Sequence, residues 1–170
     1  MNIRLTWSLA STTVASLLVF GFALPVSAET SLALTASNVI AFANADRVAL
    51  GAQPLIEDTV LNKAAQAKAD DMATKGYFAH VDPSGNAPWV WFKKAGYAYR
   101  RAGENLGLNF TDAQSLEQAW MDSPTHRANI VKGAYTRMGI GIARGTYQGK
   151  PATFVVQFFA TPYTAKVAAR

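Results

Sequence analysis

Apolar residues recur at helical spacing in two stretches of the first half of the chain. The first stretch lies between residues 38 and 50, with apolar positions at Val39, Ile40, Phe42, Ala43, Val48 and Leu50. Ser37 or Asn38 is a candidate N-cap for this predicted helix, and Gly51 is a candidate stop. The second stretch follows Asp58, a candidate N-cap, and ends at Gly76, a candidate C-terminal stop. Its positions at helical spacing are Val60, Leu61, Ala64, Ala65, Lys68 and Met72.

Shorter helical signals occupy the middle of the chain. Pro88 is suited to open a short helix over residues 89–95 that Gly96 ends. Thr111 followed three residues later by Gln114 has the form of a capping box. Ser123 and Pro124 predict one more short helix, with Ser as its cap and Pro at its first position.

The last third of the chain has strand patterns instead. Residues 138–144 alternate apolar residues with glycines, and residues 152–160 are β-branched and aromatic. A hairpin-like loop over residues 145–150 separates the two stretches. Helices followed by an antiparallel pair of strands predict an α+β fold with helices packed on a small sheet.

The first 28 residues have the character of a secretory signal. Arg4 is their only charged side chain, a long apolar stretch follows it, and Pro25 precedes the small residues Ser27 and Ala28. We expect cleavage after Ala28, with an uncleaved membrane anchor as the alternative because the apolar stretch is long enough to span a bilayer. Residues 29–37 are then a short linker, 38–162 the folded domain and 163–170 a C-terminal tail. This interpretation predicts a secreted or periplasmic protein with no stable transmembrane anchor after cleavage.

Composition narrows the chemistry that such an exported domain can use. The chain has no cysteine, which excludes disulfides, thiol nucleophiles and thiolate metal sites. Its net charge is +5, but the basic residues are scattered rather than gathered in a tract, so we expect no nucleic-acid partner.

Three ionisable residues stand out as candidates for a functional site. The chain has two histidines, His80 and His126. His80 lies in a turn-rich loop after the second predicted helix, and His126 lies in the short helix after Ser123. Glu104 lies beside Gly103, a residue type that lets the backbone approach another group closely.

The order of the motifs along the chain resembles the bacterial branch of the CAP superfamily, also called the SCP-like extracellular domain. The resemblance covers about residues 38–160. Its motifs are Asn44-x-x-Arg47, Pro54-Leu55, the His80 loop with Pro83 and Gly85, Ala95-Gly96-Tyr97, Gly103-Glu104-Asn105, Trp120, Ser123-Pro124-x-His126-Arg127-x-Asn129-Ile130, Gly139-x-Gly141 and Gln157-x-Phe159.

This resemblance implies a particular sandwich and a particular site. The fold would be an α-β-α sandwich, a small antiparallel sheet flanked by helices on both faces, with residues 103–108 adding a strand. A central cleft would hold two histidines and two acidic residues. His80, Glu104 and His126 match three of these positions, and Ser123 stands where the family's second acidic residue usually lies.

Three classes of function remain open. In the first, the domain is a non-enzymatic binding module for a divalent metal, a lipid, a small molecule or an envelope component. In the second it is a hydrolase or peptidase-like enzyme, in which Glu104 acts as the base for a zinc-bound water or a histidine activates Ser84 or Ser123. In the third it is a structural or adhesive envelope protein with a vestigial cleft. We favour a binding module rather than an enzyme, because no G-x-S-x-G or H-E-x-x-H motif is present.

A metal would be an optional ligand of this module. No cofactor is required, but two imidazoles and a carboxylate suit Zn²⁺ or a similar divalent cation. The hypothesis is that His80 and His126 bind the metal, with Glu104 as a third ligand or as a partner that supports a ligand from behind.

Overall fold

The computed structural model describes residues 32–163, and in this range five helices surround a four-stranded sheet. The helices are α1 (Ala36–Ala49), α2 (Thr59–Lys75), α3 (Trp89–Lys94), α4 (Ala113–Asp122) and α5 (Pro124–Ile130). The strands are β1 (Ile56–Glu57), β2 (Tyr99–Leu108), β3 (Arg137–Tyr147) and β4 (Lys150–Pro162). The predicted signal segment 1–28 lies outside the described residues, as do the first residues of the linker and residues 164–170 of the tail.

Several helix ends form where local chemistry predicts them. Asp58 caps α2, because its side chain accepts hydrogen bonds from the backbone N–H groups of Val60 and Leu61. Gly76 ends the same helix in the left-handed conformation, with φ of 68°. Pro124 occupies the first turn of α5, where the N–H group that proline lacks has no helical partner.

The predicted caps of α1 and α4 are wrong by a few residues. Thr35 rather than Ser37 or Asn38 caps α1, so the helix already includes the last two residues of the predicted linker. Asp112 rather than Thr111 caps α4, since its carboxylate accepts from the N–H of Ser115 at 2.8 Å. An Asp one position further on offers the same capping oxygen, so the start of the helix moves by one residue.

The sheet has the strand order β1-β3-β4-β2. β3 and β4 are antiparallel and longer than predicted, because only Gln148 and Gly149 form the turn between them. Both turn residues have positive φ, 51° and 74°, which is the type I′ geometry that matches the twist of a hairpin. β2 pairs antiparallel with the other side of β4, whereas the short β1 pairs parallel with β3.

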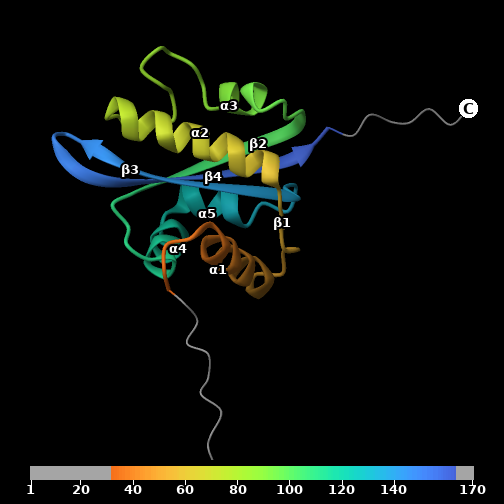
Figure 1. The fold of residues 1–170 in the computed structure, drawn as a ribbon. Coiled ribbons are helices and arrows are strands. Elements are labelled where there is room, and N and C mark those ends of the chain that lie inside the picture. Colours follow the sequence, from red (N-terminus) through yellow and green to blue (C-terminus); the bar gives the residue numbers. More distant parts are fainter. Residues whose placement is uncertain (1–31, 164–170) are drawn as a thin grey trace, which may run out of the picture. The chain divides into compact units, whose positions relative to one another are not determined.

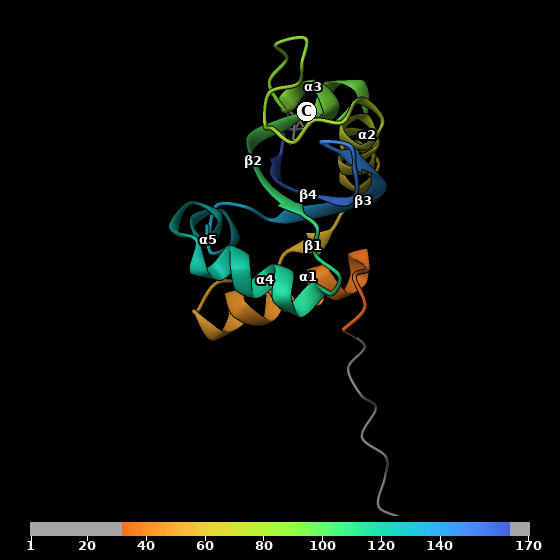
Figure 2. The same ribbon diagram turned by 90° about the vertical axis from the view of Figure 1, so that its left-hand side faces the viewer.

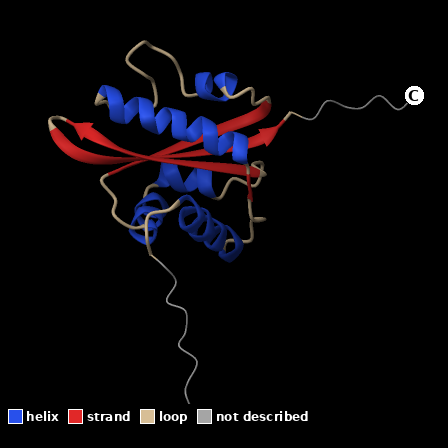
Figure 3. Cartoon of the chain, viewed as in Figure 1, coloured by secondary structure: helices blue, strands red, loops and turns tan. Residues whose placement is uncertain are grey.

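The helices cover both faces of this sheet, which confirms the predicted α-β-α sandwich. Helices α2 and α3 lie on one face and α1, α4 and α5 on the other (Figures 1 and 2). The same three layers are visible when helices and strands are coloured separately (Figure 3). Each face has its own apolar core, and β4 contributes to both: Phe154 and Phe158 face α2, and Val155 and Phe159 face α1 and α4.

Helix α2 lies unusually close to β3. A Cβ atom on Gly141 would lie 2.2 Å from the backbone carbon of Ala65, so only glycine permits this approach. The closeness lets two side chains of α2 satisfy the outer edge of β3. Asn62 accepts from the N–H of Ile140, and Gln66 bonds both the N–H and the C=O of Ile142. These amides occupy positions that a further strand would otherwise take.

Two features of the described residues bear on the surface. Val48 and Leu50 belong to the predicted apolar face of α1 but are 60% and 50% exposed. They lie at the C-terminal end of the helix, where no neighbouring element covers them. Within residues 32–163, no helix has the length and apolar character needed to cross a membrane.

Candidate functional site

His80 and Glu104 are brought together from a loop and a strand. Nδ1 of His80 lies 2.5 Å from Oε1 of Glu104, so this ring nitrogen donates to the carboxylate. The two side chains differ in environment: Glu104 is 2% exposed, whereas His80 is 59% exposed. Gly103 keeps the backbone beside Glu104 close to Tyr135, since a Cβ atom there would lie 2.4 Å from the Tyr135 hydroxyl oxygen. The expectation that a glycine here allows a close approach is therefore confirmed.

Lys68 of α2 is the partner that the sequence reasoning missed. Its ammonium group is completely buried and lies 2.9 Å from Oε2 of Glu104. It also donates to the backbone oxygen of His80 at 2.5 Å. Lys68 thus fixes both the carboxylate and the loop that carries His80. Of the two Glu104 oxygens, Oε1 contacts His80 and Oε2 contacts Lys68. The sequence contained one indication of this pairing. Lys68 lies on the alanine-rich apolar face of the predicted helix, where an unpaired charge would be costly.

His126 is held by its own helix. Its Nδ1 lies 2.8 Å from the hydroxyl oxygen of Ser123, the residue three positions before it. Ser123 occupies the N-cap position of α5, as predicted, but its hydroxyl makes no capping hydrogen bond. Burial, together with the nearby charge of His80, lowers the pKa of His126. His126 is therefore neutral at neutral pH, with a lone pair available on one ring nitrogen.

A network of amide side chains fixes α5 against β2. Asn105 donates to the backbone oxygen of His126 at 3.2 Å and to Gln157 at 3.0 Å. Asn129 donates to the backbone oxygen of Glu104 at 3.1 Å and to the side chain of Asn105 at 3.0 Å. Asn105 and Asn129 thus satisfy the backbone oxygens of His126 and Glu104. They also join the backbone of His126 to the strand that carries Glu104.

The Asn44-x-x-Arg47 motif has a structural role away from these three residues. Asn44 accepts from the backbone N–H of Leu55 at 2.7 Å and donates to its C=O at 2.9 Å. Arg47 is fully buried and donates to the backbone oxygens of Gln53 and Ile130. Its guanidinium group therefore caps the carbonyl end of α5 and ties it to α1. Burial lowers the pKa of this arginine.

The carboxylate is not free to act as a direct ligand. Both oxygens of Glu104 face His80 and Lys68, and within residues 32–163 no group of three or more His, Cys, Asp or Glu side chains is placed to hold a metal ion. Of the two roles considered for Glu104, its contacts fit a partner that orients His80 from behind. Glu117, in the same helix as Trp120, does not join His80, Glu104 and His126. Its charged neighbour is Asp46 of α1.

The serine candidates differ in their neighbours. Ser123 contacts His126, whereas Ser84 donates its backbone N–H to the carboxylate of Asp82. The surface is hollowed elsewhere: a hollow of about 570 Å³ beside α3 is lined by residues that include none of His80, Glu104 and His126.

Comparison with known proteins gives one family and several related structures. The family described as the cysteine-rich secretory protein family, CAP, matches residues 40–159. The uncharacterized Bacillus subtilis protein YkwD is 36% identical over 115 residues, which are 68% of this chain and 45% of YkwD. The chain thus spans less than half the length of this curated relative.

Solved structures share the fold at lower identity. An extracellular protein containing an SCP domain from Bacillus anthracis has a TM-score of 0.62 at 23% identity, over 74% of this chain and 39% of that one. An outer surface protein from Borrelia burgdorferi has a TM-score of 0.64 at 19% identity, over 75% of this chain and 92% of that one. At these identities the likeness establishes the fold.

Proposed function

Because this chain belongs to the cysteine-rich secretory protein (CAP) family, we propose that it is an exported, non-enzymatic binding module that holds a divalent cation between His80 and His126. The predicted signal segment supports export to the periplasm or the medium. So do the names of two proteins of the same fold, which are called extracellular and outer surface proteins. Because the chain has no cysteine, thiolate ligands are excluded, and imidazole is a suitable ligand for a divalent cation such as Zn²⁺.

One observation carries the proposal: both imidazoles are oriented through Nδ1. Glu104 holds Nδ1 of His80, and Ser123 holds Nδ1 of His126. No described residue forms a hydrogen bond with Nε2 of either ring. Nε2 is therefore the open ligand atom of His80, and also of His126 in the tautomer whose Nδ1 donates to Ser123. The lowered pKa of His126 keeps its ring neutral, which metal binding requires.

The residues around the two histidines fit a weakly held metal better than a tightly held one. A carboxylate commonly lies behind a histidine ligand of zinc, and it fixes the tautomer that presents Nε2. Two imidazoles fill fewer positions than the three or four protein ligands of most zinc sites. A cation bound here would supply Lewis acidity to an incoming oxygen ligand. The chain's own residues orient the imidazoles and keep Glu104 in place.

Calorimetric titration of Zn²⁺ into the metal-free protein tests this function. We expect saturable binding at pH 7.5 and weaker binding at pH 5.5, because protons compete for the imidazoles. His80→Ala and His126→Ala should each abolish it, whereas Glu104→Gln should weaken it by about 10- to 100-fold, as the loss of a group that orients a ligand does. Equal binding by the wild type and both histidine variants would overturn the proposal.

The contact between Ser123 and His126 supports a second candidate, a serine hydrolase. A histidine within hydrogen-bond reach can activate a serine nucleophile. Against this, the carboxylate that would orient such a base lies on His80 instead, so the three groups do not form a relay through Ser123. A fluorophosphonate probe separates the two functions: we expect no labelling, and stoichiometric labelling lost in Ser123→Ala would favour the hydrolase.

A further inference from the structure

Three aromatic rings line the hollow beside α3. They belong to Trp89 on α3, Tyr97 in the following turn and Tyr99 at the start of β2. Trp89 is 36% exposed, which is unusual for a residue type that is mostly buried. Along β2, Tyr99 is five residues from Glu104, or about 17 Å at the rise of a strand. The hollow is therefore separate from the two histidines.

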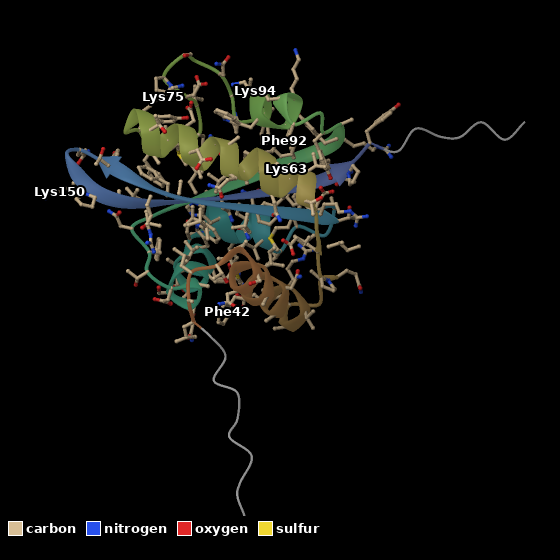
Figure 4. All side chains as sticks on the ribbon, in the orientation of Figure 1. Phe42, Lys63, Lys75, Phe92, Lys94 and Lys150 are labelled. Atoms are coloured by element: carbon tan, nitrogen blue, oxygen red, sulfur yellow. The ribbon has the colours of Figure 1, made fainter. Side chains whose placement is uncertain are left out.

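The aromatic rings that line the hollow are held in place by the residues packed beneath them. Phe92 lies under the rings, with its centroid 5.8 Å from that of Trp89 and 5.1 Å from that of Tyr99. The position of Phe92 between α3 and the sheet is visible in Figure 4. The hydroxyl group of Tyr97 donates to Asp58 at 3.2 Å, which fixes the ring. A ligand therefore meets aromatic surfaces that need little ordering on binding.

The polar groups of the hollow are basic or neutral. Lys93 and Asn86 contribute to its lining, and no carboxylate does. Asp82 fixes Asn86 through hydrogen bonds to its backbone N–H at 2.9 Å and to its side chain at 3.0 Å. Arg100, next to Tyr99, is exposed and lies at a β-bulge, an irregularity common near binding sites.

We propose that this hollow binds a sugar ring that carries a carboxylate, as part of an acidic glycan. The flat C–H face of a pyranose matches the electron-rich faces of Trp89 and Tyr99, and its carboxylate pairs with Lys93. Asn86 offers an amide to the ring hydroxyls. A cationic ligand is disfavoured by Lys93. The lining includes the small aliphatic residues Ala87, Val90 and Ala98, but the three aromatic rings and the charge of Lys93 match a sugar acid better than an alkyl chain.

Hexagalacturonate and its methyl ester are suitable probes. Both are built from the same sugar rings, but only the free acid carries carboxylate charges. Binding to the purified protein is measured by calorimetry and by the change in tryptophan fluorescence. We expect saturable binding of hexagalacturonate that Trp89→Ala weakens about tenfold or more, as for an aromatic anchor. Lys93→Ala should weaken hexagalacturonate binding but not binding of the ester, which should already be weak.

Two controls make the outcome specific. Lys150 lies at the β3–β4 hairpin, away from α3 (Figure 4), and Lys150→Ala removes the same charge there, so it should leave binding unchanged. His80→Ala should also leave binding unchanged, which separates this proposal from the cation site. Circular dichroism and melting of the Trp89→Ala protein confirm that it folds, and Trp89→Phe should retain most of the affinity.

Three results would overturn the proposal. The first is absence of saturable hexagalacturonate binding by the wild type. The second is equal affinity of the wild type and a folded Trp89→Ala variant. The third is an equal loss in Lys93→Ala and Lys150→Ala, which would show attraction to net charge rather than a site.

Discussion

Glu117 of α4 has a buried carboxyl group that makes the stability of the protein depend on pH. It is 3% exposed, and neither of its oxygens has a hydrogen-bond partner among the described residues. Burial, with the charge of Asp46 as a second cause, raises the pKa of Glu117 from 4.5 to about 8. The carboxyl group is therefore protonated in the folded protein at neutral pH, whereas it ionises in the unfolded chain.

The size of the effect follows from this difference in pKa. The contribution of the protonated group to stability is complete below pH 4.5 and is lost as the pH rises towards 8. Each pH unit in that interval lowers the free energy of unfolding by about 1.4 kcal/mol, or about 3 kcal/mol in all at pH 7. Glu117→Gln keeps the shape and cannot ionise. The variant should match the wild type near pH 4.5 and exceed its stability by about 3 kcal/mol at pH 7.

Urea unfolding followed by tryptophan fluorescence at pH 5, 6, 7 and 8 measures this difference. The stability gain of Glu117→Gln should grow with a slope of about 1.4 kcal/mol per pH unit and level off near pH 8. Asp122→Asn removes an exposed carboxylate from the same helix and should show no such slope. A gain that is constant between pH 5 and 8 would refute the reasoning, since it would mean that Glu117 is solvated or paired in solution.

Two other substitutions test the site and the core. Lys68→Met should destabilise the protein by about 3 to 5 kcal/mol, because it removes the buried cation beside Oε2 of Glu104 and leaves only the exposed His80 as a partner of the carboxylate, and adding Glu104→Gln should recover part of the loss in urea unfolding. Trp120→Ala should cost about 3 to 5 kcal/mol, because the ring is 2% exposed and donates to the backbone oxygen of Leu106. His126→Ala should cost less than about 1 kcal/mol in the same melt if the half-buried ring serves a ligand, and a loss near that of Trp120→Ala would instead make His126 a structural residue.

The fold was predictable where short-range chemistry decides the conformation. A cap at Asp58, a left-handed Gly76 and a proline at the start of α5 need only their immediate neighbours. Prediction was less accurate where two adjacent residues could do the same job, as with Thr111 and Asp112 at α4. The sandwich itself followed from the family resemblance, because the pairing of β2 with β4 joins residues about fifty positions apart.

The candidate site was likewise predictable only in part. Residue types and motif order marked His80, Glu104 and His126 as candidates, but not the partner of each nitrogen and oxygen. Lys68 is 36 positions before Glu104 in the sequence, and only the packing of α2 on the sheet brings their side chains together. The contact of His126 with Ser123 is local by contrast, because residues three positions apart in a helix lie within reach of each other.

The amides of α2 that satisfy the edge of β3 also determine what partial unfolding would expose. If α2 detached, Asn62 and Gln66 would leave the backbone groups of Ile140 and Ile142 open to pairing with another chain. The same event would withdraw Lys68 from Glu104. Loss of the site and the onset of self-association would then share one opening step. Agents that slow the release of α2 should therefore protect against aggregation and loss of binding together.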